Sequence, residues 1–299
     1  MAKRIANVIV DSPIREPLDY LVPADIEIQV GQRCLVPLGT RKVVGIVVGF
    51  SEESRFSKLR EVISRVDDIA PLSFGWLALT SFAARYYQSG WGQVAIPALP
   101  KFFRKLPGKL HERSLERLRK EKKRAVKEPS EKPHLNSEQS AIVEEFQMDG
   151  AFYPALIFGI TGSGKTEVYL HLMEKVLLSD PAAQVLLMVP EINLTPQLVE
   201  RVQSRFPQLE VVSWNSGMAE GQKASSWLAC HEGRARILVG TRLSVFASFK
   251  SLKLILVDEE HDPSFKSQEG VRYNARDLAL KRASIEKIPI VLGSATPSL

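Results

Sequence analysis

Hydrophobic residues between positions 133 and 299 gather in short runs, separated by segments long enough to form helices. The runs occupy residues 155–158, 185–189, 237–239, 254–257 and 290–292. Strands that are apolar on both faces are typical of a parallel sheet covered by helices on each side. The pattern therefore predicts an α/β domain built on a parallel sheet.

The first hundred residues have a different pattern, which predicts a small β-rich domain. The expected strands are rich in apolar and β-branched residues and occupy residues 5–10, 17–23, 32–38 and 41–49. The last two flank Gly39-Thr40, which is the arrangement of a β-hairpin with a glycine-containing turn. Helical spacing follows over residues 73–87.

The composition is that of a globular protein with one large domain or two ordinary ones. The 299 residues are 44% hydrophobic and 25% charged. No run approaches the ~20 apolar residues of a membrane span, and the first residues lack the apolar core of a signal peptide. Cys34 and Cys230 are too few for a zinc cluster. We therefore expect a cytoplasmic protein that uses no zinc and no membrane.

Positive charge is concentrated in residues 101–132. This segment holds 13 Lys or Arg and 5 Glu, whereas the rest of the chain has a net charge of −2. Its prolines and its scarcity of β-branched residues predict an exposed helix or a linker. Two interpretations stay open: a solvated spacer, or a surface that contacts nucleic-acid phosphates and gains counterion-release entropy.

The segment Gly159-Ile-Thr-Gly-Ser-Gly-Lys-Thr166 fits the phosphate-binding pattern G-x-x-x-x-G-K-[ST]. It follows an apolar strand and opens a helical pattern over residues 167–178, the context that this motif needs. Its glycines let backbone N–H groups surround an anion at the positive end of the helix. The side chains and amides expected to hold ATP and its Mg²⁺ belong to Gly159, Gly162, Ser163, Gly164, Lys165 and Thr166. Of these, Lys165 would reach the β- and γ-phosphates, and Thr166 would bind the metal.

Acidic residues follow another apolar strand, at Asp258-Glu259-Glu260-His261. The carboxyl ends of parallel strands face the crevice where such sheets bind ligands. We therefore expect Asp258 to hold Mg²⁺ and Glu259 to orient or deprotonate the attacking water. For His261, a loop histidine and a coupling residue are both compatible with the sequence.

These motifs resemble those of superfamily 2 helicases, and within them those of the PriA family of replication-restart DNA helicases. Residues 135–139 are similar to the family's segment whose glutamine, here Gln139, reads the adenine edge. Residues 189–196 and 240–246 are similar to motifs Ia and Ib, which lie along single-stranded DNA. The resemblance implies a RecA-like first helicase lobe. It also implies a coupling role for motif II and motif III residues, here His261, Ser294, Ala295 and Thr296.

Residues 261–277 resemble the aromatic-rich loop that couples DNA binding to ATP hydrolysis in this family. The resemblance implies that Phe265 and Tyr273 stack on bases and that Lys266 and Arg272 contact phosphates. Without the resemblance, both aromatic residues would be interpreted as core positions.

The N-terminal residues resemble the family's domain that binds the 3′ end of the nascent leading strand. Leu18-Asp19-Tyr20 is similar to the strand that forms the pocket, and Gly39 and Arg60 match further pocket positions. Arg60 stands where the family has a lysine, which keeps the charge but changes the hydrogen-bond geometry. The resemblance implies that Asp19 accepts a hydrogen bond from a 3′-hydroxyl and that Tyr20 stacks on a base.

The sequence departs from the family pattern in its domain content. Residues 101–132 stand where family members carry a winged-helix domain, and neither a second helicase lobe nor the family's zinc-binding cysteines are found in the sequence. The second lobe would supply an arginine worth about 10³–10⁵ in turnover. We therefore expect weak ATP binding and little unwinding by this polypeptide alone.

The leading hypothesis is the ATP-binding and DNA-binding part of a 3′-to-5′ DNA helicase that recognises stalled or branched forks and starts primosome assembly. Its expected ligands are ATP, Mg²⁺, forked DNA and single-stranded DNA; by resemblance, its partners include single-strand-binding protein and other primosome proteins. One alternative is a fork-DNA binding module with a vestigial ATPase. Another is an unrelated P-loop NTPase, such as a kinase, against which the aromatic-rich loop argues. The expected domains are residues 1–100, 101–132 and 133–299.

Overall fold

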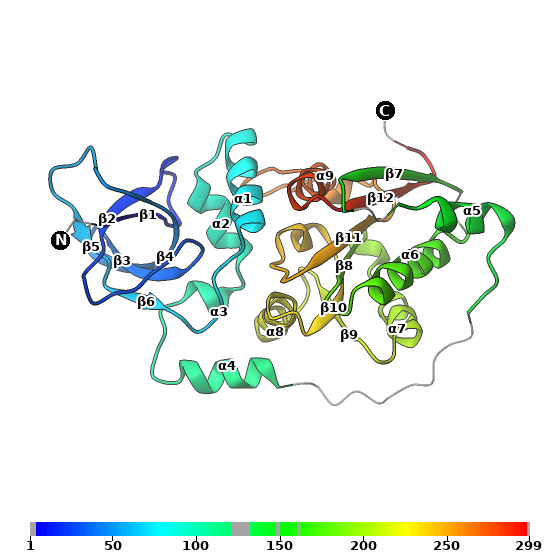
Figure 1. Ribbon diagram of the computed structural model, residues 1–299, viewed down its shortest axis with the longest axis horizontal. Coiled ribbons are helices and arrows are strands. Elements are labelled where there is room, and N and C mark those ends of the chain that lie inside the picture. The colour runs from blue at the N-terminus through cyan, green and yellow to red at the C-terminus, as the bar shows by residue number, and fades with distance from the viewer. Residues whose placement is uncertain (1–3, 121–131, 148–149, 161, 298–299) are drawn as a thin grey trace. The chain divides into compact units, whose positions relative to one another are not determined.

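The computed structural model describes residues 4–120, 132–147, 150–160 and 162–297. Contacts divide the chain into two compact units, one of Met1–Lys120 with Glu220–Ser225 and the other of Glu121–Ala219 with Ser226–Leu299. Each unit contains its own six-stranded sheet and its own buried core (Figure 1). Among the described residues, no helix has both the length and the apolar character needed to cross a bilayer.

The first unit is built on a mostly antiparallel sheet with the strand order β5-β2-β1-β4-β3-β6. Its strands are β1 Ile5–Ile9, β2 Leu18–Leu21, β3 Arg33–Leu38, β4 Arg41–Ser51, β5 Arg60–Glu61 and β6 Ser64–Val66. The predicted hairpin is confirmed, because β3 pairs antiparallel with β4 up to Leu38 and Arg41. Gly39 turns the chain there with a φ of +59°, a conformation that disfavours any side chain.

Four helices follow this sheet along the chain: α1 Phe74–Tyr86, α2 Trp91–Ala98, α3 Lys101–Arg104 and α4 His111–Arg119. The α1 helix starts after Ser73, whose hydroxyl accepts a hydrogen bond from the Trp76 amide. The α4 helix is attached to the sheet through Asp68, whose carboxylate pairs with both Arg33 of β3 and His111. The first part of the basic segment is therefore folded in the first unit. Residues 121–131 of that segment lie outside the described residues.

The second unit contains an all-parallel sheet with the order β7-β12-β11-β8-β10-β9, which confirms the predicted α/β class. Its strands are β7 Tyr153–Phe158, β8 Gln184–Met188, β9 Glu210–Trp214, β10 Ala235–Gly240, β11 Leu252–Val257 and β12 Pro289–Ser294. The edge strand β9 was not predicted, because only two of its five residues form an uninterrupted apolar pair.

Both faces of the parallel sheet are buried. In β8, Val185 and Leu187 join a core cluster with residues of α6 Lys165–Ser179, while the alternate residue Leu186 is equally buried. Figure 1 shows α6 and α7 Pro196–Arg205 on one side of the sheet. The helices α8 Glu220–His231 and α9 Ala275–Glu286 lie on the other side. This layering explains why the strands are continuous apolar runs in the sequence.

The remaining elements lie around the carboxyl ends of the strands. They are α5 Ser137–Glu145 and three single 3₁₀ turns, η1 Glu191–Asn193, η2 Arg242–Phe246 and η3 Pro263–Phe265. Because β7, β12 and β11 are neighbouring parallel strands, the residues that follow their carboxyl ends lie next to one another at the same end of the sheet.

Candidate nucleotide and DNA sites

The predicted phosphate loop connects β7 to α6. Gly162 and Gly164 have φ values of +82° and +87°, in the left-handed region that favours glycine. A side chain on Gly159 would meet the Ser163 hydroxyl at 2.6 Å, so the loop closes tightly only because this residue is glycine. Gly164 is the N-cap of α6, and the first amides of any helix lack intrahelical acceptors. The loop thus has the geometry of an anion cradle.

Lys165 is the first residue of α6, and its side chain points back over the loop. Its Nζ donates to the Gly159 carbonyl oxygen at 2.8 Å and lies 3.2 Å from Oε1 of Glu259. The side chain is only 7% exposed. Lys165 and Glu259 are therefore brought together, as the sequence predicted for one catalytic site. Thr166 follows on the first turn of α6 and is half-buried.

Glu259 adopts a strained backbone conformation. Its φ is +46°, in the left-handed region that costs a non-glycine residue roughly 1–2 kcal/mol. Such outliers persist where surrounding structure fixes them, and they cluster at functional sites. Here the conformation turns the chain directly after β11 and directs the Glu259 carboxylate to Lys165.

Asp258 lies at the end of β11, where its amide donates to the Met188 carbonyl oxygen at 2.9 Å. Its Oδ1 accepts a hydrogen bond of 3.0 Å from the Tyr169 hydroxyl of α6. Burial raises the pKa of Asp258, and the Tyr169 hydrogen bond opposes that rise. Burial and the nearby Asp258 raise the pKa of Tyr169, so its hydroxyl keeps its proton and donates. Tyr169 is not recognisable from the sequence, since nothing in the motif spacing distinguishes it from a core tyrosine.

Ser294, at the end of β12, connects the two motifs. Its carbonyl oxygen accepts from the Gly159 amide at 3.0 Å, and its hydroxyl contacts Nδ1 of His261 at 2.8 Å. The Thr296 amide donates to the same hydroxyl at 3.1 Å, and Ala295 lies between them. His261 also lies 3.8 Å from Glu259. The predicted coupling residues therefore form one bonded path between the phosphate loop and the acidic strand end.

Gln139 lies beside the phosphate loop on the first turn of α5. Its side-chain Nε2 donates to the Ser163 carbonyl oxygen at 2.9 Å, and its Oε1 accepts from the Asn136 amide in a capping box. One hydrogen bond thus joins the predicted ATP-binding glutamine to the loop, and the capping bond fixes its side chain at the start of α5.

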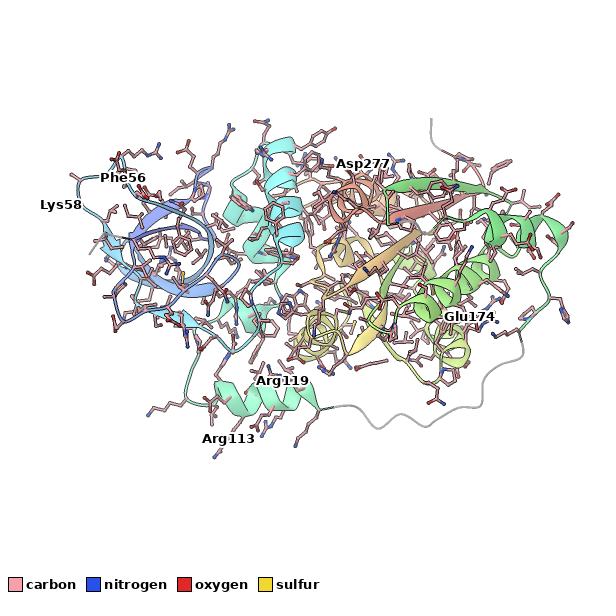
Figure 2. The ribbon with its side chains drawn as sticks, viewed as in Figure 1. Phe56, Lys58, Arg113, Arg119, Glu174 and Asp277 are labelled. Atoms are coloured by element: carbon pink, nitrogen blue, oxygen red, sulfur yellow. The ribbon has the colours of Figure 1, made fainter. Side chains whose placement is uncertain are left out.

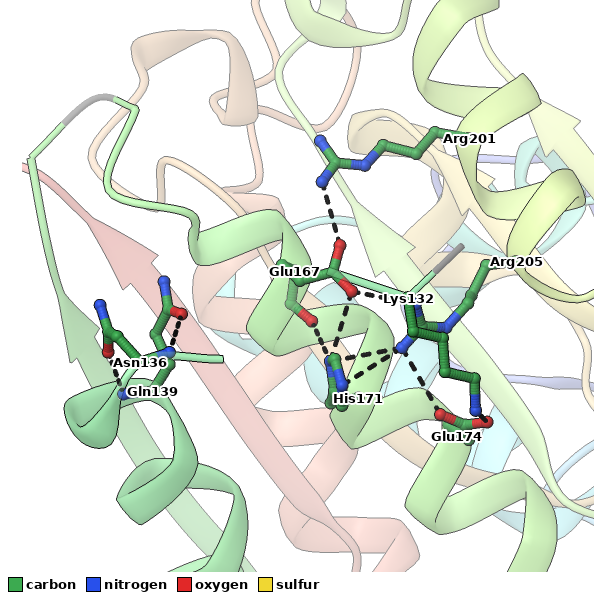
Figure 3. Close-up of polar contacts among 8 residues, drawn as sticks. All are labelled: Lys132, Asn136, Gln139, Glu167, His171, Glu174, Arg201 and Arg205. Atoms are coloured by element: carbon green, nitrogen blue, oxygen red, sulfur yellow. Dashed lines mark hydrogen bonds and ion pairs between the residues drawn. The ribbon is translucent and has the colours of Figure 1, made fainter. Parts of the chain in front are cut away.

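A partly buried ionic network joins the phosphate-loop helix to α7 (Figure 3). The Glu167 carboxylate lies 3.1 Å from Arg201 and 3.0 Å from Arg205, which are one turn apart on α7. Arg205 also contacts the His171 ring and lies 3.5 Å from Glu174. Because α7 starts at the end of the motif Ia-like segment, this network fixes that segment relative to the loop. This network is not recognisable from the sequence, since Glu167 and Arg205 lie 38 residues apart.

The prediction that Phe265 and Tyr273 stack on bases disagrees with the structure. Their side chains are 1% and 7% exposed, and the Tyr273 ring packs edge-on against Phe246 at 5.0 Å. Neither ring has a face free for a base, so both are core residues here. Lys266 and Arg272, in contrast, are both exposed.

The aromatic rings are buried because the loop folds back on itself. Lys266 and Asn274 form an antiparallel bridge. Arg242 of the motif Ib-like segment donates to the carbonyl oxygens of Ser264 and Lys266 at 3.2 and 3.1 Å. These backbone contacts hold the loop against η2.

The residues predicted for a 3′-end pocket are divided between two sides of β2. Tyr20 is 4% exposed and its hydroxyl donates to the Pro37 carbonyl oxygen, so the predicted stacking on a base is wrong for this structure. Leu18, on the same strand, is half-buried. Arg60 donates to the Gly39 carbonyl oxygen at 2.6 Å, which brings these two predicted residues together.

Asp19 lies on the opposite side from Tyr20, since successive side chains of a strand alternate. Its carboxylate accepts hydrogen bonds from the Asn7 side-chain amide at 2.9 Å and from the Ser54 hydroxyl at 2.6 Å. It lines an open pocket of about 490 Å³, together with Pro17, Gly49 and Trp91.

A family model matches most of each unit's residues. The model of the PriA 3′ DNA-binding domain matches residues 7–100, and the model of the DEAD/DEAH box helicase matches residues 136–298. Replication restart protein PriA of Rickettsia felis is 35% identical over 296 residues, covering 99% of this chain and 43% of that protein.

Two further relatives carry the same name. PriA of Haemophilus influenzae is 32% identical over 367 residues, covering 99% of this chain and 50% of that protein. PriA of Bacillus subtilis is 48% identical over 144 residues, covering 48% of this chain and 18% of that protein. The chain thus spans at most about half the length of these three relatives. Since the helicase model covers more than half of the chain and follows the PriA-type domain, the chain belongs to the DEAD/DEAH box helicase family and resembles the N-terminal part of replication restart protein PriA.

Proposed function

We propose that this chain is the ATP-binding and DNA-binding part of a 3′-to-5′ DNA helicase that recognises stalled or branched replication forks and starts primosome assembly for replication restart. The observation that carries the proposal is the meeting of Lys165, Asp258, Glu259 and Ser294 at one edge of the parallel sheet. The match of the other unit to the PriA 3′ DNA-binding domain supports the choice of DNA as the partner.

Membership of this helicase family implies use of a nucleotide and Mg²⁺, and the residues present fit both. The loop glycines offer backbone amides to phosphates, and Lys165 offers a cation. The described residues contain no group of three or more His, Cys, Asp or Glu that could hold a metal. Thr166 and Asp258 would hold Mg²⁺ together with the phosphate oxygens themselves. The metal would neutralise the charge that develops on the phosphates.

Each remaining side chain has a proposed role toward the nucleotide. Glu259, fixed beside Lys165, would orient or deprotonate water. Gln139 would read the adenine edge. The coupling residues would respond to the presence of nucleotide; they are Ser294, His261, Ala295 and Thr296. A shift of Gly159 must move the Ser294 carbonyl oxygen, to which the Gly159 amide donates.

For the DNA, we propose separate contacts in the two units. Asp19, Gly39 and Arg60 would contribute to binding a 3′ end, and the solvent-accessible Lys266 and Arg272 would contact single-strand phosphates. Single-strand-binding protein and other primosome proteins are proposed partners, and the cytoplasm is the proposed location. We also propose that the DNA-binding domain extends through α4, because Asp68 ties His111 to Arg33.

Calorimetric titration of ATP with Mg²⁺, followed by single-turnover ATPase assays with and without forked DNA, tests the proposal. DNA-stimulated hydrolysis that is lost in Lys165→Ala is the expected result. Lys253→Ala, an exposed lysine on β11, is the matched control. Fork binding that is indifferent to ATP and to Lys165→Ala would instead establish a DNA-binding module without ATPase function. Absence of any nucleotide binding would overturn the enzymatic proposal.

A further inference from the structure

Tyr169 lies between the phosphate-loop helix and the acidic strand end. It is four residues after Lys165 on α6, so the two side chains lie one turn apart on the same face of the helix. The Tyr169 ring is 1% exposed in the core cluster beneath the sheet edge. Its hydroxyl reaches beyond this core to Oδ1 of Asp258 at 3.0 Å.

The space for this hydroxyl exists only because residue 293 is glycine. A Cβ at position 293 would lie 1.6 Å from the Tyr169 hydroxyl oxygen and 2.9 Å from Cζ of its ring. Gly293 immediately precedes Ser294, and its carbonyl oxygen accepts from the Glu260 amide at 3.0 Å. The hydroxyl therefore occupies a junction of α6, the end of β11 and the end of β12.

This arrangement restrains the Asp258 carboxylate. A carboxylate on a short side chain can rotate about its Cβ–Cγ bond, which exchanges its two oxygens. The Tyr169 hydroxyl, held by its buried ring, donates to Oδ1, and the Glu259 backbone also donates to this carboxylate, so one orientation of the carboxylate is selected. Residues that orient metal ligands in this way typically contribute about 10- to 100-fold to metal affinity.

We propose that Tyr169 is a positioning residue for the carboxylate that would hold magnesium: its hydroxyl, accommodated by Gly293, fixes the Asp258 carboxylate in one orientation. This inference rests on the proposed ATP- and Mg²⁺-binding function. A purely structural tyrosine would contribute packing through its ring and would not influence the metal dependence of nucleotide binding.

Tyr169→Phe keeps the ring and removes only the hydroxyl. Binding of a fluorescent ATP analogue is measured as a function of Mg²⁺ concentration and again in excess EDTA. We expect the half-saturating Mg²⁺ concentration to rise about 10-fold, while binding in EDTA stays unchanged because the phosphate loop is intact. The matched control is Tyr153→Phe, which changes a half-buried tyrosine on β7 and should behave like the wild type.

If the wild type binds Mg·nucleotide and Tyr169→Phe shows the same Mg²⁺ dependence, this inference alone is overturned. A wild type that binds no Mg·nucleotide would overturn both this inference and the proposed function. A loss of binding in EDTA equal to the loss in Mg²⁺ would also overturn it, because the effect would then be structural.

A second pair of variants tests the junction itself. Gly293→Ala places a methyl group at the hydroxyl position, and Tyr169→Phe removes the atom that it meets first. Urea unfolding should therefore show Gly293→Ala to be less destabilising in the Tyr169→Phe background than in the wild type. Strictly additive changes in the unfolding midpoint would show that the two residues do not share this space.

Discussion

Nζ of Lys165 lies 3.2 Å from Oε1 of Glu259 and 2.8 Å from the Gly159 carbonyl oxygen, so protein oxygens satisfy the lysine in this structure. A triphosphate must compete with Glu259 for the same cation. Removing the competing charge should therefore favour binding even though it removes the group expected to act on water.

Glu259→Gln should separate nucleotide binding from hydrolysis. We expect ATP affinity to rise, because Lys165 no longer has to leave the Glu259 carboxylate to contact the phosphates. Hydrolysis should fall by about 10²–10⁴, the range for loss of a general base. Equilibrium binding and single-turnover hydrolysis measure the two effects. A parallel loss of both would show that Glu259 helps to hold the nucleotide.

The network around Glu167 should make a large contribution to the stability of the second unit. Glu167 and Arg205 are both buried, and removing one leaves the other with a weaker partner, Arg201 for Glu167 and Glu174 for Arg205, so the cost should approach but not reach the about 3–5 kcal/mol of a fully unpaired buried charge. The single variants Glu167→Leu and Arg205→Leu should each lower the urea midpoint strongly. The double variant should be less destabilised than the sum of the singles, and additivity would contradict the pairing.

Both cysteines should be unreactive in the folded protein. Burial raises the pKa of Cys34 to about 12, and burial also raises that of Cys230. A raised pKa disfavours the thiolate, which is the reactive form, so both thiols should stay protonated in the folded chain at pH 8. Ellman's reagent should therefore react slowly with the native chain and rapidly with both thiols in urea. Fast reaction of either thiol before unfolding would contradict this burial.

A 3′-phosphate on the nascent strand should weaken fork binding if Asp19 contacts the strand end. The Asp19 carboxylate is held in place by hydrogen bonds from Asn7 and Ser54. A phosphate added to the strand end would place a second negative group beside this carboxylate. Affinities for forks ending in a 3′-hydroxyl and a 3′-phosphate are compared, with a 5′-phosphate as the control. Asp19→Asn should reduce the difference, and equal affinities would remove Asp19 from the pocket.

Arg113 and Arg117 should contribute to duplex binding if α4 contacts phosphates. Both side chains are exposed and lie one helical turn apart, and Figure 2 shows Arg113 extending away from its helix. Replacing both with Gln should reduce the slope of log affinity against log salt by ~0.9 per contact. Arg65→Gln, an exposed arginine paired with Asp67, is the control. An unchanged slope would identify the helix as a spacer.

The sequence predicted the parts of the site that are determined by the spacing of residues along a short segment. The phosphate loop lies between its strand and its helix, and Asp258 follows β11, because glycine spacing and strand periodicity determine both. Taken without the family resemblance, Tyr20, Phe265 and Tyr273 would be interpreted as core residues, and the structure buries all three. The resemblance assigned them to bases instead. An aromatic ring suits a core and a base equally well, and only tertiary packing decides between them.

Gly293 also restricts how this chain can change over time. Any larger residue at this position meets the Tyr169 hydroxyl before it meets any other atom. A mutation at position 293 is therefore tolerated best after the tyrosine has already lost its hydroxyl, whereas the reverse order passes through a crowded intermediate. One missing side chain thus sets the order in which two neighbouring positions can evolve.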